Sequence, residues 1–448
     1  MSASLIKIIG GLLVLVFLII NLFYKGDRNR LYLKFVILTL PFIGVKFIPN
    51  IDAFTGVSVL FFLFFHERND VDFFENQLYK FIVYSLFLSI LIGFYVADIK
   101  PDLETIIHYF RLIPVFLYTS LIIRETSDDI DFFYEFISWI RLILIFSFVF
   151  LCAQFIFGPK FSLSGTLRPN VLINDGVRYP SFLADPQHYS QFVSVMCFIS
   201  LVKPLEKKYG YKDLLLVLFS LIAIMSSGGR SGLMGFLLGF TLIILFSKGY
   251  YKFIFILVGI ALYFVLLQFQ DNFAIFKRGT DLDNAYAFRY SIWMEAFDIF
   301  KKNPFFGIGF DNYAKHVFLH NPNQFWLDNH ELLPYDVPEN GNLKLLTELG
   351  GVGFLFVYIL FLYPILSLLI YFLKRKDYNI LLLFCSMLSF LFSFNGTYTL
   401  GEQRIFILMI SIISCVISYK HLVVNNLTII DEEEHDDEND DDDDEDEN

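Results

Sequence analysis

Among the charged side chains in polar segments between hydrophobic blocks, four are candidates to act on a ligand: Arg178, Arg230, Arg289 and Glu339. A guanidinium offers a planar fork of donors that clamps a diphosphate through two parallel hydrogen bonds, which the point charge of a lysine does not reproduce. A carboxylate can accept a proton from an attacking hydroxyl when its surroundings tune its pKa. These residue types are therefore typical of a site that binds a phosphate group and moves a proton.

Each of these residues also has a simpler alternative. Arg178 can meet lipid headgroups at a membrane interface. The glycines around Arg230, in the segment 226–232, can form an anion cradle with their backbone N–H groups or a plain packing turn between two helices. Glu339 can be an exposed loop carboxylate. An arginine between two apolar segments is costly unless it faces a wet cavity or an anion, so Arg230 remains a functional candidate.

The segment 288–313 has to position Arg289, and it carries its own helical pattern. Polar residues alternate with an apolar side at helical spacing, which predicts an amphipathic helix. Pro304 ends this helix, and Gly307 and Gly309 then allow a tight backbone reversal. A surface helix followed by a glycine turn fits a lid or floor over a membrane-embedded cavity. The positions on one side of the helix are Arg289, Trp293, Ala296 and Phe300.

The composition predicts an all-α, polytopic integral membrane protein. The chain has 448 residues, of which 56% are hydrophobic, and a mean hydropathy of +0.58, whereas soluble domains contain about 45–50% apolar residues. About 20 apolar residues in a helix span the hydrocarbon of a bilayer, and the sequence offers about 12–13 such blocks. They cover residues 5–24, 31–48, 53–65, 78–97, 105–123, 136–157, 188–202, 213–226, 233–246, 253–269, 352–373, 378–394 and 405–418.

These blocks divide the chain into four parts. We predict transmembrane helices 1–10 in residues 1–269 and helices 11–13 in residues 352–420. Between them, residues 270–351 are predicted to form one large periplasmic loop. Residues 421–448 are predicted to form an acidic, disordered cytoplasmic tail. The tail holds 15 of the 46 acidic residues, so the net charge of −12 says little about the rest of the chain. Short loops rich in Lys and Arg mark the cytoplasmic side. They lie at residues 25–30, 203–212, 248–252 and 374–376.

The loops on the opposite side carry motifs that resemble one family. Residues 289–312 follow the pattern R-x-x-I-W-x-x-A and then N-P-x-x-G-I-G-x-x-N, which is similar to the large periplasmic loop of the O-antigen polymerase and ligase family. The segment 178–186 resembles an R-x-x-G element of that family, with Ser181 where glycine is usual. The segment 226–232 resembles its glycine and arginine turn. The segment 339–350 resembles its H-N-x-x-L-x-x-L-x-E-x-G element, with Glu339 in the histidine position.

The resemblance implies an integral-membrane glycosyltransferase that acts on undecaprenyl-diphosphate-linked oligosaccharide at the periplasmic side of a bacterial inner membrane. In this mechanism Arg178, Arg230 and Arg289 stabilise the departing diphosphate without a metal or other cofactor, and the transfer inverts the anomeric carbon. The family's histidine belongs to ligases, which join O-antigen to lipid A core, so Glu339 favours a polymerase with a carboxylate as base. The alternatives are a ligase that transfers glycan to lipid A core or protein, and a polysaccharide transporter or flippase.

The same resemblance suggests substrate-binding roles for Trp293, Asn312, Asn340 and Glu348, with Glu348 paired to a neighbouring arginine. The partners it implies are the lipid-linked glycan as donor and acceptor, the lipid bilayer and a chain-length regulator, with no nucleic acid. Trp293 and Trp326 can hold sugar rings, although packing is the usual role of aromatic residues. His316 and His320 are expected to be solvated, and His330 is a candidate for proton transfer.

The four cysteines lie inside hydrophobic blocks at no metal-like spacing and are expected to be small core residues that form neither a disulfide nor a metal site. They are Cys152, Cys197, Cys385 and Cys415.

Overall fold

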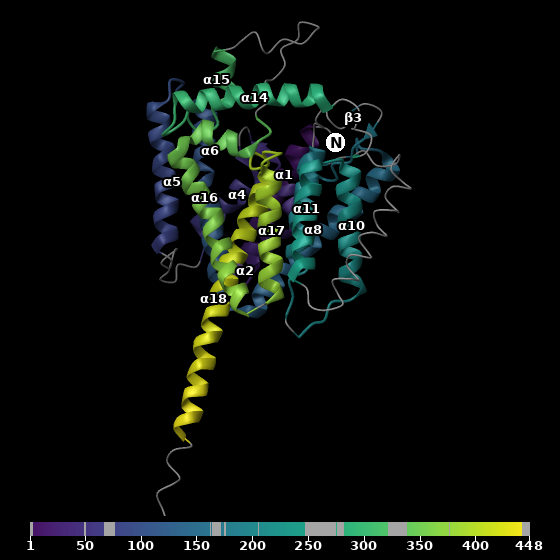
Figure 1. The fold of residues 1–448 in the computed structure, drawn as a ribbon, viewed down its shortest axis with the longest axis vertical. Coiled ribbons are helices and arrows are strands. Elements are labelled where there is room, and N and C mark those ends of the chain that lie inside the picture. The colour runs from purple at the N-terminus through teal and green to yellow at the C-terminus, as the bar shows by residue number, and fades with distance from the viewer. Residues whose placement is uncertain are drawn as a thin grey trace, which may run out of the picture.

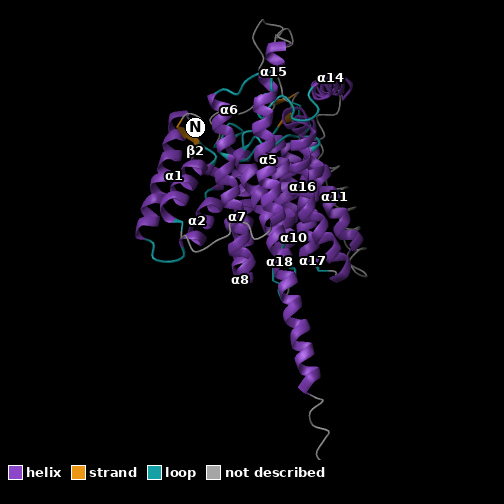
Figure 2. Cartoon of the chain, turned by 90° about the vertical axis from the view of Figure 1, so that its left-hand side faces the viewer, coloured by secondary structure: helices purple, strands orange, loops and turns teal. Residues whose placement is uncertain are grey.

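The computed structural model describes residues 3–48, 51–66, 77–161, 163, 172–173, 176–204, 206–246, 275, 282–320, 338–375 and 377–440. Within these residues the chain is a bundle of helices that run between two ends of the molecule, with two short antiparallel strand pairs near one end (Figures 1 and 2). The predicted all-α polytopic fold is confirmed.

The helices and strands follow one another along the chain as follows. The first part contains α1 (Ala3–Phe23), α2 (Arg28–Leu38), α3 (Leu40–Ile43), β1 (Lys46–Ile48), β2 (Ile51–Asp52), α4 (Ala53–Leu60), the π-helix η1 (Phe61–Phe65), α5 (Gln77–Val96), α6 (Leu103–Phe110), α7 (Leu112–Asp128) and α8 (Ile130–Phe157). The second part contains β3 (Leu172–Ile173), β4 (Gly176–Val177), α9 (Pro186–Ile199), α10 (Tyr211–Ser227), α11 (Arg230–Phe246), α14 (Leu282–Lys302), α15 (Tyr313–His320), α16 (Gly341–Arg375), α17 (Tyr378–Phe394) and α18 (Gln403–Asp440).

Five segments of the described chain are long and apolar enough to cross a membrane, and several shorter apolar helices accompany them. The five are Tyr79–Val96, Leu103–Asp128, Ile130–Phe157, Gly341–Leu373 and Gln403–Leu422, and the shorter ones are Lys7–Phe23, Ala53–Phe65, Arg230–Phe246 and Tyr378–Phe394. Each of them overlaps a predicted hydrophobic block, as do α9 and α10. The predicted block at residues 253–269 lies outside the described residues.

The predicted span at residues 31–48 is not one helix. α2 ends at Leu38, α3 has only 4 residues, and strand β1 follows. Pro41 lies in the first turn of α3, where its missing N–H does no harm. The 11 residues of α2 rise about 16 Å at 1.5 Å per residue, which is roughly half of the hydrocarbon thickness. The block therefore supplies a short helix and a strand instead of a membrane span.

The two ends of the bundle differ. α14 lies across one end, with α15 beyond it, and α18 leaves the bundle at the other end (Figure 1). We name these the loop end and the tail end. At the tail end, the backbone N–H of Lys203 donates to Asn379 over 3.3 Å, and the hydroxyl of Tyr419 on α18 donates to Asp377 over 2.6 Å. The basic loop 203–212 and the tail helix thus share one end, in agreement with the charge pattern.

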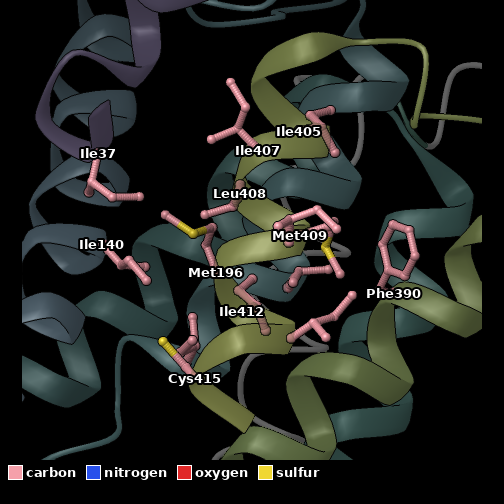
Figure 3. Packing of buried hydrophobic residues seen from close by; sticks show 14 of the residues in the cluster. Ile37, Ile140, Met196, Phe390, Ile405, Ile407, Leu408, Met409, Ile412 and Cys415 are labelled. Atoms are coloured by element: carbon pink, nitrogen blue, oxygen red, sulfur yellow. The ribbon is translucent and has the colours of Figure 1, made fainter. Parts of the chain in front are cut away.

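α18 lies at the centre of the bundle. Its apolar side chains are buried among residues of α2, α8, α9 and α17 (Figure 3). Hydroxyl groups pair within this core: Tyr118 with Ser411 at 3.0 Å and Thr126 with Ser418 at 2.7 Å. Because a buried polar group without a partner costs free energy, these pairs hold α7 and α18 in one register. The labelled apolar residues are Ile37, Ile140, Met196, Phe390, Ile405, Ile407, Leu408, Met409, Ile412 and Cys415.

The tail and the cysteines differ in part from the predictions. Disorder is predicted from residue 421, but α18 continues to Asp440. Adding residues to a helix that has already formed needs no new nucleation step. Residues 441–448 lie outside the described residues. All four cysteines are free thiols, and Cys152 is exposed on α8 instead of buried in the core.

Candidate active site

A cavity of about 410 Å³ lies inside the bundle, with charged and polar groups at the loop end. The elements that supply these groups are β1 and β2, α6 and the residue that follows it, the segment before α15, the first turns of α16 and the turn before α18. Most of these elements come from distant parts of the sequence. The polar lining residues are Lys46, Asp52, His108, Arg111, Asp311, Lys344, Glu348, Tyr398, Glu402 and Gln403.

Apolar side chains line the rest of the cavity, toward the middle of the bundle. They come from α5, α7, α16 and α18, which are membrane-length helices. On α18 the lining runs from Gln403 to Ile413, a rise of about 15 Å. A charged and polar region followed by an apolar shaft fits an amphiphilic ligand with a polar head and a hydrocarbon tail. The apolar residues include Leu86, Ile90, Val115, Phe116, Val357, Phe361, Phe406 and Ile410.

Lys344 and Glu348 form a buried ion pair in the polar part of the cavity. They stand one helical turn apart on α16, with Nζ and Oε1 3.7 Å apart, and their side chains are only 9% and 3% exposed. The backbone N–H of Tyr313 donates to the same Glu348 oxygen over 3.3 Å. The prediction that Glu348 pairs with an arginine is wrong, because the lysine at i−4 already lies on its face of the helix. Lys344 also lies over the ring of Tyr398, 4.2 Å from its centroid.

His108 and Asp311 form a second pair that lines the cavity. Nδ1 of His108 on α6 lies 2.7 Å from Oδ2 of Asp311, which precedes α15. Burial acts to raise the pKa of the Asp311 carboxyl, but the hydrogen bond with His108 and the charge of Lys344 hold it below its ordinary value. Nearby, Lys315 bonds to Asp102 over 2.8 Å. These contacts fasten the segment before α15 to α6.

Arg111 is a third charged group in the cavity. It forms an ion pair with Asp52 of β2, a side chain that is 1% exposed, and donates to Gln403 over 2.8 Å. The short strand pair β1 and β2 therefore serves to bring a carboxylate to this arginine.

The glycine turn of residues 303–309 packs directly on a kink in α16. The backbone N–H groups of Ile308 and Gly309 donate to the carbonyl oxygens of Thr347 and Glu348 over 2.9 and 3.0 Å. Gly307 and Gly309 have φ of 66° and 95°, and Gly350 at the kink has φ of 64°, values that favour glycine. A Cβ on Gly307 would lie 2.5 Å from those carbonyl oxygens. The predicted backbone reversal at Gly307 and Gly309 is confirmed. It allows the backbone of the glycine turn to form hydrogen bonds with the backbone of α16.

α14 is the predicted amphipathic helix, and it covers the loop end of the bundle (Figure 1). Its buried positions are Ile292, Ala296 and Ile299, spaced at i, i+4 and i+7. The predicted face is therefore shifted by one position, since Trp293 and Phe300 are only half-buried. Trp293 lies at the surface of this covering helix. Trp326 and His330 lie outside the described residues.

Arg178 is a buried brace in this structure. It is 1% exposed, and its Nε donates to the carbonyl oxygen of Ser227, the last residue of α10, over 2.8 Å. Ser181, three residues later, has φ of 54°, which explains why glycine suits this position. The serine is held there because its N–H donates to Gln154 over 2.8 Å and its hydroxyl to the carbonyl of Ser147 over 2.8 Å.

Arg230 begins α11 directly after that turn, and its side chain is exposed. The glycines around it serve helix packing. A Cβ on Gly229 would lie 1.9 Å from the hydroxyl of Ser190 on α9, and a Cβ on Gly232 would lie 2.5 Å from the carbonyl carbon of Ser190. The N–H of Gly228 donates to carbonyls of its own helix. Of the two alternatives for this turn, the contacts favour close packing.

Arg289 and Glu339 form an ion pair between α14 and the residues that lead into α16. Nη2 and Oε2 lie 2.5 Å apart, with the side chains 39% and 29% exposed. Asn340, the next residue, caps α16 by accepting from the N–H groups of Asn342 and Leu343 over 3.0 and 3.2 Å. The structure thus assigns Asn340 a capping role.

Asn312 is fully buried and ties the loop to the bundle. Its side-chain amide donates to the carbonyl oxygens of Ile99 and Ile308, each over 3.1 Å. It therefore positions its neighbour Asp311. His316 is buried rather than solvated, because α15 packs on α14 and on the glycine turn. Its ring stacks on His320 at 4.1 Å between centroids.

The turn of residues 395–402 connects these parts. Thr397 bonds to Ser231, the neighbour of Arg230, over 2.8 Å, and Asn395 bonds to Asn342 of α16. Tyr398 of the same turn lines the cavity. Of the eight predicted site residues, only Glu348 lines the cavity. Arg178 bonds the end of α10, Arg230 follows the turn after it, and Arg289 and Glu339 pair before the start of α16.

The cavity residues that the sequence interpretation missed include His108, Arg111, Asp311 and Lys344. A signal was present for two of them. His108 and Arg111 fall in the apolar block 105–123, and an ionisable residue within a membrane segment is a functional candidate by default. Asp311 and Lys344 fall inside recognised motifs, between positions that the motifs specify.

The comparisons with known proteins agree with the motifs. Residues 215–358, about a third of the chain, match the family model described as O-antigen ligase. The matched segment includes Arg230, Arg289, Glu339 and Glu348. A search among curated proteins finds no match. Residues 215–358, which contain the glycine turn and the kinked start of α16, are therefore similar to the O-antigen ligase family.

Proposed function

We propose that the protein is a membrane glycosyltransferase that polymerises oligosaccharide repeat units linked to undecaprenyl diphosphate. The observation that carries this proposal is the cavity of about 410 Å³ with charged groups at the loop end and an apolar shaft below them. A lipid-linked glycan has a hydrocarbon tail, an anionic diphosphate and a sugar in that order. The match of residues 215–358 to the family model supports a glycan substrate.

In the proposed reaction, a hydroxyl of the acceptor glycan attacks the anomeric carbon of the donor from the face opposite the diphosphate, which inverts that carbon. The leaving diphosphate carries negative charge that preorganised cations stabilise. Arg230 is exposed and Arg289 is partly exposed, so both can meet an anion at the loop end. Arg178 is buried, and we assign it to holding the turn that carries Arg230.

The choice of polymerase rests on Glu339. In the family's ligase-like motif a histidine stands at this position, and here a carboxylate stands there and is engaged by Arg289 over 2.5 Å. We place the loop end at the periplasmic side of a bacterial cytoplasmic membrane, because the basic loop 203–212 lies at the tail end.

A reconstituted reaction tests the proposal. Purified protein in lipid nanodiscs is supplied with undecaprenyl-diphosphate repeat units alone, and the products are separated by size. A polymerase gives a ladder of longer lipid-linked glycans, whereas absence of any ladder contradicts the proposal.

The second candidate is a ligase, favoured by the description of the matching family model. Its signature is different: no ladder forms from lipid-linked repeats alone, and glycan is transferred once lipid A core or an acceptor protein is added.

A further inference from the structure

One pair of cavity residues has the geometry of an oriented base. His108 and Asp311 lie 203 positions apart in sequence, yet Nδ1 of the imidazole and Oδ2 of the carboxylate are 2.7 Å apart, and both side chains line the cavity. When Nδ1–H donates to the carboxylate, the imidazole is fixed in one tautomer and orientation, and Nε2 carries a lone pair. The ring nitrogen that remains for a ligand in the cavity is therefore a proton acceptor.

The backbone holds the carboxylate in place. Asp311 has φ of 59°, one of two non-glycine residues with positive φ in the described part of the chain. Such a conformation is strained for a residue with a side chain and persists where the surroundings enforce it. Here Gly309 with φ of 95° precedes it and the doubly bonded Asn312 follows it. The turn is therefore built to present the Asp311 side chain to α6.

Most of the other charged groups that line the cavity form ion pairs, including Glu402, which pairs with Arg404 over 2.7 Å. Lys344 is paired with Glu348 on α16, and Arg111 with Asp52 of β2. Outside the lining, Lys315 of α15 pairs with Asp102, the N-cap of α6, over 2.8 Å. Glu339, the base expected from the sequence, forms an ion pair with Arg289. His108 is therefore the lining group whose chemistry best suits proton acceptance from a hydroxyl near neutral pH.

We propose that His108 is the general base of glycosyl transfer and that Asp311 is its positioning residue, an inference that rests on the proposed function. Nε2 accepts the proton of the acceptor hydroxyl as its oxygen forms the new bond to the anomeric carbon. The bond from that carbon to the diphosphate oxygen breaks, and the electron pair leaves with the diphosphate. The imidazolium then returns its proton to water or to the released diphosphate.

The test compares three variants with the wild type in the reconstituted reaction. His108→Gln lowers kcat by about 10²–10⁴-fold with little change in KM, because the substrate still binds. Asp311→Asn keeps the backbone, since asparagine tolerates positive φ. It lowers kcat and moves the acid limb of the pH profile to lower pH, because a neutral amide does not stabilise the imidazolium. His320→Gln, an exposed histidine on α15, is the matched control and leaves kcat unchanged.

Imidazole rescue provides an independent readout. His108→Ala leaves space for free imidazole, which restores part of the activity if proton transfer is the missing step; a folded His108→Ala protein that imidazole does not rescue overturns the proposal. A wild type that makes a ladder together with a His108→Gln variant of similar kcat also overturns it and leaves the proposed polymerase standing. A wild type that transfers no glycan removes the proposed function and this inference with it.

Discussion

At the scale of single residues, the arginines have separate tasks. Arg178 is 1% exposed and bonds the end of α10, whereas Arg230 is exposed three residues beyond that end. The same substitution should therefore affect stability at one position and activity at the other. A substitution that keeps the formal charge therefore distinguishes a structural arginine, Arg178, from an arginine proposed to bind an anion, Arg230.

Replacement of each arginine by lysine tests this division. Arg178→Lys should lower the free energy of unfolding by about 1–3 kcal/mol, because a buried carbonyl loses a donor of fixed geometry. Arg230→Lys should leave stability within about 0.5 kcal/mol and lower kcat at least about tenfold through loss of the bidentate fork. Thermal unfolding in detergent and the ladder assay measure the two effects. Wild-type polymer from the lysine variants of Arg230 and Arg289 would remove the clamp hypothesis.

Glu339 belongs to the same scale. Its ion pair with Arg289 is partly exposed, and such a pair contributes only about 0–1 kcal/mol to stability. We expect Glu339→Gln to reduce kcat less than tenfold, because the carboxylate orients Arg289 and does not take the proton. Arg289→Lys should reduce kcat by a larger factor. The reduction in the double variant should be smaller than the product of the reductions in the two single variants. A loss of 10²-fold or more in Glu339→Gln would instead assign it the role of base.

At the scale of elements, the contact between the glycine turn and the kink of α16 organises the site. It sets where Lys344 and Glu348 stand relative to Asp311, since backbone bonds join the two segments at residues 304–309 and 347–352. Gly350 has φ of 64°, and a Cβ there would lie 2.3 Å from the carbonyl oxygen of Phe305. The kink therefore depends on the absence of a side chain.

We expect Gly350→Ala to destabilise the protein by about 2–4 kcal/mol, from backbone strain and the clash with Phe305. Gly11→Ala is the control, because a Cβ on Gly11 meets nothing within 4 Å and alanine favours a helix interior by about 1 kcal/mol. The free energy of unfolding in denaturant measures both. Equal stability of the two variants would contradict the role assigned to the kink.

α15 should respond to pH. Burial, followed by the charge of His320, lowers the pKa of His316 below its ordinary value of 6.5. The folded segment therefore binds fewer protons than the unfolded one, so its stability is full above pH 6.5 and falls as the pH drops below 6.5. Hydrogen-exchange protection of residues 313–320, referred to α17 in the same sample, should decrease between pH 7.5 and 5.5. His316→Gln should abolish that decrease, and a decrease that persists in the variant would assign it to another group.

At the scale of the whole molecule, the ends of the bundle define its orientation. α14 and the cavity lie at the loop end, and the basic loop 203–212 lies at the tail end with α18. Lys and Arg in short loops keep those loops in the cytoplasm. The active site should therefore face the periplasm, where the acceptor glycan must reach it.

Cysteine labelling tests this orientation. In a variant whose four native cysteines are replaced by serine, Lys301→Cys on α14 should react with a membrane-impermeant maleimide once the outer membrane is opened. Lys207→Cys at the tail end should react only after lysis. Both lysines are exposed, so accessibility in the folded protein does not separate them. The opposite labelling pattern would invert the topology.

Local patterns determined much of this molecule from the sequence alone. Apolar blocks of membrane length predicted the helices, and the glycines at 307 and 309 predicted a reversal that the backbone shows at φ of 66° and 95°. The reason is physical: burial in a membrane and backbone conformation both act on consecutive residues. The prediction of a membrane span at residues 31–48 was wrong, because hydrophobicity does not distinguish a span from a short helix. Here α2 ends before Thr39, and Pro41 lies in the first turn of a separate short helix.

Only the tertiary structure decided which side chains meet. His108 contacts Asp311, which is 203 positions away in sequence, and Arg111 contacts Asp52, which is 59 positions away. Helices pack alongside one another in the fold, and no local sequence pattern encodes which residues become neighbours. The motifs marked Arg178 and Asn312 as site residues, yet packing buries both as braces. Glu348 pairs with Lys344 for the same reason: the partner of a buried charge is whichever opposite charge the packed elements bring within reach, and that is a property of the whole fold.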